Sequence, residues 1–302
     1  MTSQPKLLIF GGSGFVGEHL ASMAVHKGWD TVIADHVSHP TIRGVEWRMV
    51  DITQISAVEQ AIRETQPGAV VNTAALADID RAEREQALAW QVNVEGARYV
   101  ADICARQAIR HVFFSSDAVF DGVNGPYSET DEVSPLNYYG FTKAEAEKAV
   151  LGVCPEAVVI RISLVLGFPV TTGNSFLMGL DAKLRAGDVI PCPQDEVRTP
   201  VDVLTLCEGV LELLTGSFAG LLHVGSKESV NRYDLTREVT HRLGYPVKMV
   251  QPLAPHAAST GRAPRHKNGI LDISKSQRVL KTPMLDLDKS INKAIATKPA
   301  SD

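Results

Sequence analysis

The sequence predicts an α/β fold: a doubly wound parallel sheet of the Rossmann type with a smaller C-terminal lobe. Three observations predict it. Short apolar segments alternate with helix-length segments through the first half of the chain, a glycine-rich turn follows the first apolar segment, and proline and glycine punctuate the chain after Ser163. Strands that are joined through helices pair in parallel, and right-handed crossovers place the helices on both faces of the sheet.

The first predicted strand, residues 6–10, leads directly into the glycine-rich turn. Residues 11–17 read Gly-Gly-Ser-Gly-Phe-Val-Gly, and residues 18–27 have helical character. This order is typical of a dinucleotide phosphate site, although glycine turns are common in strand–helix units generally. Glycine lets backbone N–H groups approach a pyrophosphate, and the helix N-terminus carries a partial positive charge. We therefore expect cofactor contacts from Gly11, Ser13, Gly14, Phe15, Val16 and Gly17.

The remaining elements follow from the same alternation. Strands are expected in the short apolar runs at residues 31–34, 45–50, 69–72, 111–115, 157–162 and 221–224. Helices are expected at residues 55–66, 81–107 in one or two pieces, 141–151, 202–214 and 233–243. Pro67 and Gly68 end the first of these helices, because proline cannot continue the hydrogen-bond ladder.

The regular alternation breaks after Ser163, which predicts two lobes. Residues 1–166 plus about 200–225 are expected to form an NAD(P)-binding Rossmann domain. Residues of about 167–199 plus 226–302, which include a loop rich in proline, glycine and basic residues at 252–269, are expected to form a smaller substrate-binding lobe that closes over the carboxyl ends of the strands.

Composition excludes several classes of function. The hydrophobic content of 44% is ordinary for a soluble protein, and the formal charge of −5 offers no attraction to nucleic acid or to an anionic membrane. The four cysteines are scattered without a CxxC pair, which favours free thiols in a reducing compartment over disulfides or a metal site. There is no signal-peptide pattern and no stretch long enough to span a bilayer. We expect a cytoplasmic protein without metal, nucleic acid or membrane partners.

Polar residues at the ends of the next strands test the cofactor prediction. Asp35 ends the second strand, where a carboxylate accepts hydrogen bonds from ribose hydroxyls and repels a 2′-phosphate. This favours NAD(H) slightly over NADP(H), although His36 blurs the choice and a turn or helix-cap role for Asp35 is the alternative. The alternatives at the ends of the third and fourth strands are plain turn and packing roles. Further cofactor contacts are expected there from Asp51, Ile52, Asn72, Ala74 and Ala75.

The catalytic prediction comes from a tyrosine and a lysine four residues apart. Tyr139 and Lys143 fall on one face at the start of a predicted helix, and Ser115 and Ser116 end the fifth strand, at the edge where doubly wound folds place their chemistry. A nearby ammonium is expected to lower the pKa of the tyrosine, and a serine hydroxyl can hold a substrate oxygen. These groups suit proton transfer to a carbonyl as hydride arrives from a nicotinamide. The alternatives are a surface tyrosine and a simple pair between Lys143 and Glu147.

The sequence resembles an extended short-chain dehydrogenase/reductase and, within that superfamily, the dTDP-4-dehydrorhamnose reductases. The similarity covers nearly the whole chain. The positions that differ from the usual residues of the family cluster in segments expected to contact substrate. The shared motifs are residues 11–17, 70–75, 92–96, 115–122, 126–131, 139–143 and 271–272. Departures occur at Ala118, Arg198, Thr205 and Cys207, where tyrosine, glycine, aspartate and alanine are usual, and residues 262–267 match the usual Arg-Pro only loosely.

The resemblance implies roles for individual residues. Ser116 stands at the position of the family's catalytic threonine or serine, Tyr139 would protonate the reduced carbonyl oxygen, and Lys143 would bind the nicotinamide ribose and tune the tyrosine. The family reduces the 4-keto group of a nucleotide-linked 6-deoxysugar with NADH or NADPH, often as a homodimer. Substrate contacts are expected from Asp117, Asn174, Arg198 and Arg265. For the two arginines, the alternative is a solvated surface charge.

Three functions are compatible with the resemblance. The first is an NAD(P)H-dependent reductase of a keto group on a nucleotide-diphosphate sugar. The second is another extended-family reaction: sugar epimerisation, dehydration or reduction of a different polar carbonyl. The third is a non-catalytic NAD(P)-binding subunit, since the regulatory subunit of methionine adenosyltransferase resembles the same reductases. The presence of Ser116, Tyr139 and Lys143 favours an enzyme.

Overall fold

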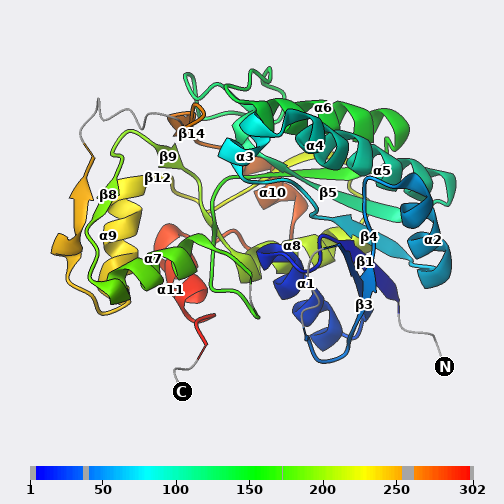
Figure 1. Ribbon diagram of the computed structural model, residues 1–302, viewed down its shortest axis with the longest axis horizontal. Helices are drawn as coiled ribbons and strands as arrows, with labels where there is room; N and C mark the ends of the chain where they lie inside the picture. The colour runs from blue at the N-terminus through cyan, green and yellow to red at the C-terminus, as the bar shows by residue number, and fades with distance from the viewer. Residues whose placement is uncertain (1–4, 37–40, 172, 254–261, 300–302) are drawn as a thin grey trace.

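The computed structural model describes residues 5–36, 41–171, 173–253 and 262–299. Within them, a seven-stranded parallel sheet has the order β11-β6-β5-β4-β1-β2-β3 (Figure 1). Its strands are β1 Lys6–Phe10, β2 Asp30–Asp35, β3 Val45–Met49, β4 Ala69–Asn72, β5 Arg110–Ser116, β6 Val158–Ile162 and β11 Gly220–Val224. The strand order reverses between β1 and β4, so the predicted doubly wound α/β fold is confirmed.

Alternate residues of β1 serve two hydrophobic cores. Leu7 and Ile9 pack toward helices α1 (Phe15–His26) and α8 (Val203–Thr215), whereas Leu8 and Phe10 pack toward α2 (Ile55–Thr65) and α5 (Ala97–Arg106). Successive side chains of a strand point to opposite faces, so a strand that is apolar throughout needs helices on both. Helices therefore cover both faces of the sheet (Figure 1).

The predicted helix at residues 81–107 is divided. It consists of α3 (Ile79–Arg84), α4 (Gln86–Trp90), a π-helical turn η1 (Gln91–Gly96) and α5, and the break comes at Glu85, whose backbone is not helical. The buried Asn93 in the π-helical turn accepts a hydrogen bond from Leu76 N at 2.7 Å and donates one to Thr142 Oγ1 at 2.9 Å. This side chain links the loop after β4 to helix α6 (Tyr138–Val153).

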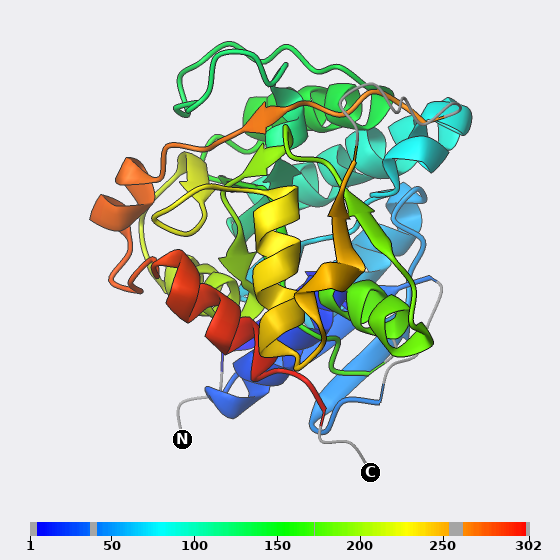
Figure 2. The ribbon, with the colours of Figure 1, turned by 90° about the vertical axis from the view of Figure 1, so that its left-hand side faces the viewer.

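A second group of elements surrounds a separate core (Figure 2). Its helices are α7 (Phe176–Ala186), α9 (Arg232–Arg242) and α11 (Leu287–Ile295), and only α9 was expected from the sequence. Further short elements follow: α10 (Ser274–Val279), η3 (Val247–Met249), and strands β7 Val165–Leu166, β8 Ile190–Cys192, β9 Val197–Arg198, β10 Val201–Asp202, β12 Val230–Asn231, β13 Val250–Pro252 and β14 Asn268–Gly269. The predicted loop at 252–269 includes β14, and its residues 254–261 lie outside the described part of the chain.

The loop after β7 reaches back to α1. Buried Glu18 accepts a hydrogen bond from Thr171 N at 3.0 Å and another from the Thr171 hydroxyl, and His19 Nε2 donates to Phe168 O at 2.7 Å. The chain segment that enters α7 is thus held beside the N-terminal half of α1. None of the helices in the described residues is long and apolar enough to cross a bilayer.

Candidate active site

The glycine turn between β1 and α1 is shaped by close backbone contact. Gly11 has φ +75°, and a Cβ there would lie 2.5 Å from Ala74 N. A side chain at Gly17 would meet Gly11 O at 2.4 Å. Only glycine leaves this room, so the turn lies directly against the end of β4. The N-terminus of α1, with Gly14 as its first flanking residue, opens beside this turn.

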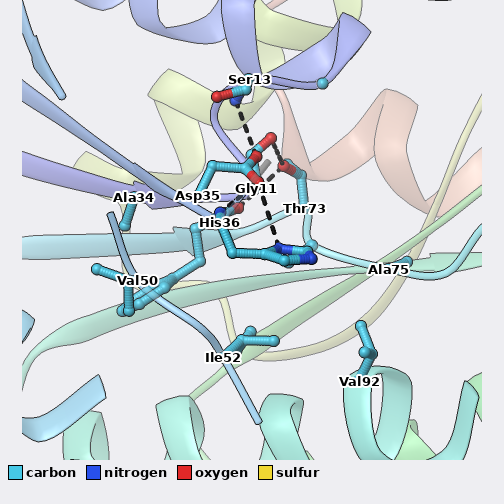
Figure 3. A pocket seen from close by; sticks show the side chains of 13 residues that line it. Gly11, Ser13, Ala34, Asp35, His36, Val50, Ile52, Thr73, Ala75 and Val92 are labelled. Carbon is cyan, nitrogen blue, oxygen red and sulfur yellow. Dashed lines mark hydrogen bonds and ion pairs between the residues drawn. The ribbon is translucent and has the colours of Figure 1, made fainter. Parts of the chain in front are cut away.

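A cavity of about 240 Å³ lies at this turn, on the carboxyl side of the central strands (Figure 3). Asp35 Oδ2 accepts a hydrogen bond from Ser13 N at 3.2 Å, and its Oδ1 accepts one from His36 N at 2.7 Å. Ile52 and Val92 provide an apolar wall facing the carboxylate. A carboxylate, an apolar wall and a glycine cradle at a helix N-terminus fit the adenosine and phosphate parts of a dinucleotide.

The cavity contains part of the predicted cofactor set. Seven predicted residues line it: Gly11, Ser13, Gly14, Asp35, Ile52, Ala74 and Ala75. Sequence reasoning missed other lining residues, which flank the predicted strand ends: Phe10, Ala34, His36, Val50, Thr73 and Val92.

Five predicted cofactor residues lie elsewhere around the turn. Asp51 is exposed and caps a turn through Thr53 N at 2.9 Å, the plain role left open by the sequence. Asn72 is buried, and its Oδ1 accepts from Ala74 N at 3.0 Å. Phe15 and Val16 pack against the core between the sheet and α8, and Gly17 supports the turn. Apart from Asp51, these residues support the turn without lining the cavity.

The second group, Ser116, Tyr139 and Lys143, comes together at the carboxyl end of β5. Helix α6 begins at Tyr138, capped by Asn137, whose Oδ1 accepts from Gly140 N at 2.8 Å. A Cβ at Gly140 would lie 2.0 Å from Ala118 O, so only glycine lets the helix approach the turn that follows Ser116. This contact places Tyr139 close enough to Ser116 for the serine hydroxyl to influence the pKa of the phenol.

The charge states differ from the sequence-based expectation. Burial and the nearby Asp117 carboxylate raise the pKa of Tyr139 to about 12, against the opposing effect of the Ser116 hydrogen bond. The expectation that Lys143 lowers this pKa is wrong here. Lys143 Nζ instead donates to Phe114 O and lies 4.3 Å from the centre of the Phe113 ring, and burial lowers its own pKa to about 7. An ammonium committed to a backbone carbonyl and largely desolvated does not favour tyrosinate.

The four predicted substrate residues have different environments. Asn174 is exposed, just before α7. Arg265 donates to Asp80 Oδ2 at 3.0 Å and to Ala263 O at 2.7 Å. Arg198 is buried and donates to the carbonyl oxygens of Val197, His266 and Lys267, so it is not the solvated surface charge considered as an alternative.

Asp117 is also buried, and protein side chains surround its carboxylate. Ser116 Oγ donates to Oδ1 at 3.1 Å, while Ser163 Oγ at 2.6 Å and His266 Nε2 at 3.1 Å donate to Oδ2. In this structure the aspartate faces protein donors rather than an open substrate crevice.

Residues 5–299, nearly the whole chain, match the family model of the RmlD substrate binding domain. The chain belongs to this family. It is 33% identical over 259 residues to dTDP-4-dehydrorhamnose reductase from Mycobacterium tuberculosis, covering 82% of this chain and 79% of the relative. It is 26% identical to methionine adenosyltransferase 2 subunit beta from Danio rerio, covering 91% and 84%. Membership confirms the predicted resemblance and makes the chain an oxidoreductase of the short-chain dehydrogenase/reductase type.

Solved structures share the fold. The dTDP-4-dehydrorhamnose reductase of Bacillus anthracis, crystallised with NADP, superposes with a TM-score of 0.86 at 23% identity, covering 97% of this chain and 99% of that one. WbmG of Bordetella bronchiseptica, crystallised with NAD and UDP, superposes with a TM-score of 0.83 at 21% identity, covering 98% and 95%. The whole architecture, including the smaller group of elements, is therefore common to these proteins.

Proposed function

We propose that this family member is an NAD(P)H-dependent reductase of a keto group on a nucleotide-diphosphate sugar, resembling dTDP-4-dehydrorhamnose reductase. The observation that carries the proposal is the contact between α6 and the end of β5, which brings Ser116, Tyr139 and Lys143 together. They lie at the edge of the sheet formed by the carboxyl ends of the strands, where the cavity at the glycine turn also lies. The named reductases among the relatives support the class of substrate.

In this proposal the cofactor lies across the carboxyl ends of the strands. Gly11, Ser13 and Gly14 hold its phosphates, Asp35 holds the adenosine ribose with NAD(H) slightly preferred, and Lys143 holds the nicotinamide ribose. The nicotinamide, when bound, supplies the hydride that reduces the carbonyl. The elements at about 167–199 and 226–302 form the lobe that binds the sugar nucleotide, with Asn174 and Arg265 as candidate contacts.

Tyr139 is the general acid of the proposed reaction. Because its pKa is about 12, the phenol keeps its proton at neutral pH and can donate it to the substrate oxygen as negative charge develops there. Ser116 would donate to that oxygen the proton that it otherwise donates to Asp117 Oδ1. An acid this weak gives up its proton only to a strongly basic acceptor such as an alkoxide, which couples proton donation to reduction.

The test is a set of nucleotide sugars incubated with NADH and, separately, with NADPH. We expect dTDP-4-dehydrorhamnose to oxidise at least one cofactor, with a single configuration at C4 of the product. Conversion of a sugar without net cofactor oxidation would indicate the epimerase or dehydratase alternative. Binding of a cofactor without turnover of any sugar would favour the non-catalytic alternative, which the similarity to methionine adenosyltransferase 2 subunit beta keeps open.

The proposal extends to assembly and location. We expect a homodimer in the cytoplasm, and sedimentation equilibrium of the purified protein tests the first point. A mass of about one chain at all concentrations would contradict it.

A further inference from the structure

A buried polar cluster behind Ser116 has no part in the proposed reaction as described so far. Asp117 is its centre, with Ser163, His266 and Arg198 around one carboxylate oxygen and Ser116 on the other. These residues come from four separate stretches of the chain. The buried carboxylate needs these partners, because an unpaired buried charge is costly.

His266 is the unusual member of the cluster. It is 4% exposed, and its Nε2 lies 3.1 Å from Asp117 Oδ2. Because an ionised carboxylate can only accept, Nε2 must carry the proton. The Nδ1 atom is buried and finds no hydrogen-bond partner among the described residues. The ring therefore has one polar partner there, Asp117, and the sequence predicted no role for it.

The backbone leaves room for this pair. A Cβ at Gly269, in β14, would lie 2.5 Å from His266 Nε2 and 2.7 Å from Asp117 Oδ2. Any larger residue at this position would push the imidazole and the carboxylate apart. The local backbone is thus compatible with the hydrogen bond between His266 and Asp117 only while residue 269 is glycine.

The pair reaches the reaction site through one hydroxyl. Ser116 Oγ donates its proton to Asp117 Oδ1 and accepts from Ala118 N at 3.1 Å, which fixes the orientation of the hydroxyl beside Tyr139. If Asp117 moved, the hydroxyl would lose its acceptor and its orientation, and if Asp117 became protonated, the hydroxyl would donate to a neutral and therefore weaker acceptor.

We propose that His266, acting through Asp117, is a positioning residue that orients the Ser116 hydroxyl against the Tyr139 phenol. This rests on the proposed roles of Ser116 and Tyr139. It replaces the expected substrate contact from Asp117 with a supporting role in the same site.

Electrostatics agree with the geometry. Burial alone would raise the pKa of Asp117, but His266, Arg198 and the Ser163 hydroxyl outweigh it and hold that pKa below its ordinary value. Arg198 Nε lies 3.7 Å from Asp117 Oδ2. On the side of the carboxylate that faces Ser116, the nearby titratable group is Tyr139. Without the His266 donor, the carboxylate accepts a proton at a higher pH, and Ser116 then donates to a neutral, weaker acceptor.

The first test compares His266→Leu, His266→Gln and wild type in NADH or NADPH oxidation with dTDP-4-dehydrorhamnose. Glutamine keeps a donor and leucine does not. We expect leucine to lower kcat about 10-fold to 100-fold, since misplacement of a reacting group has effects of that size, with little change in the KM for cofactor. The acid limb of the kcat profile should move to higher pH with leucine and return with glutamine. Equal losses in both variants, or an unmoved acid limb, would overturn the proposal.

The second test needs no substrate. The urea midpoints of His266→Leu, Ser116→Ala and the double variant form a double-mutant cycle between residues whose link is Asp117. We expect the midpoint shifts to be non-additive, because members of one hydrogen-bond network are energetically coupled, and to become additive in an Asp117→Ala background, which removes the shared partner. Additive shifts in the presence of Asp117 would overturn the positioning role. If wild type reduces no sugar, the proposed function fails and this cycle alone decides the role of His266.

Discussion

At the scale of single residues, burial rather than sequence spacing decides the charge states of the proposed catalytic groups. Tyr139 and Lys143 are four residues apart, yet the amine is committed to the Phe114 carbonyl, the pKa of the phenol is raised and the pKa of the amine is lowered. Transfer of a charged group out of water opposes its ionisation whatever its neighbours in sequence. The phenol of Tyr139 therefore keeps its proton and can act as a donor.

Tyr139→Phe removes the proposed acid and leaves the ring. We expect kcat for reduction to fall about 10²-fold to 10⁴-fold, the usual contribution of general acid catalysis, with the Kd for NADH or NADPH nearly unchanged. Stopped-flow turnover and fluorescence titration measure the two quantities. Tyr138→Phe, one residue earlier on α6, is the matched control and should retain turnover. A Tyr139→Phe enzyme as fast as wild type would eliminate this residue as the acid.

Asp35 has an observed structural contact and a proposed role in cofactor selection, and a single substitution would affect both. Its carboxylate holds Ser13 N in the glycine turn and is proposed to select against a 2′-phosphate. Asp35→Asn keeps an acceptor oxygen for Ser13 but removes the charge, so it should strengthen NADPH binding relative to NADH. Asp35→Ala should in addition weaken both cofactors. Calorimetric Kd values for the two cofactors check this, and an unchanged ratio in Asp35→Asn would count against charge selection.

Lys143 should make stability depend on pH. Its pKa is about 7 when folded, compared with 10.5 for an ordinary lysine, so the unfolded chain binds more protons between these values. Stability from this group therefore rises with pH across that window and is lowest below pH 7. Relative to wild type, Lys143→Met should gain most near pH 6, and the gain should shrink as pH approaches 10. Urea unfolding at several pH values measures this, with Lys148→Met, at an exposed lysine of the same helix, as the control.

At the scale of elements, a buried ion pair fixes α6 against the sheet. Glu147 of α6 and Arg161 of β6 meet at 2.6 Å with side chains 5% and 3% exposed, and Ser115 also donates to Glu147. This pair, with the close approach at Gly140, sets where the first turn of α6, which carries Tyr139, lies relative to β5. From the sequence, Glu147 was considered only as a partner of Lys143. A spacing of four residues along a helix can be recognised in a sequence, whereas a contact between a helix and a strand cannot.

Arg161→Met should leave the Glu147 charge buried without its partner. We expect the free energy of unfolding to fall by about 3–5 kcal/mol. The double variant Glu147→Leu with Arg161→Met should recover much of that loss, because no isolated charge remains. Chemical denaturation measures both. Lys148→Met, which breaks an exposed pair with Glu145, is the control and should change stability by less than about 1 kcal/mol. A double variant less stable than the single one would refute this account.

At the scale of the whole molecule, contacts between distant segments connect the smaller group of elements to the sheet. The Thr171 N–H and hydroxyl donate hydrogen bonds to Glu18 on α1. Asp80 on α3 accepts hydrogen bonds from Arg265 and from Ala263 N. The segments before α7 and before β14 are thereby tied to helices of the large sheet. These ties define where the proposed substrate lobe sits over the strand ends.

Thr171→Val tests one of these ties. The buried Glu18 carboxylate would lose a donor, and we expect a loss of about 1–3 kcal/mol in the free energy of unfolding. Thr130→Val, at an exposed threonine, is the control and should be nearly neutral. Proteolysis between residues 168 and 175 should also become faster in Thr171→Val. An unchanged cleavage rate with unchanged stability would show that the tie contributes nothing.

The short strands of the smaller group were not predictable from sequence. β9 has two residues and pairs with both β12 and β14, so its hydrogen bonds join residues near 198, 230 and 269. No periodic pattern develops over two residues, and the pairing depends on where the large sheet holds each segment. Helices α7 and α11 were also missed. Helix α7 lies in the stretch where proline and glycine obscure the alternation, whereas α11 is a nine-residue helix close to the C-terminal end of the sequence.

The sequence by itself determined the order of the central strands and helices, the glycine turn, and the helix that carries Tyr139 and Lys143, because these depend on residues close together in the chain. The tertiary structure alone decided which predicted residues line the cavity, that Lys143 turns to a backbone carbonyl, and that Asp117 and Arg198 are buried beside His266. Those outcomes depend on desolvation and on contacts between distant segments, and neither exists until the chain has folded.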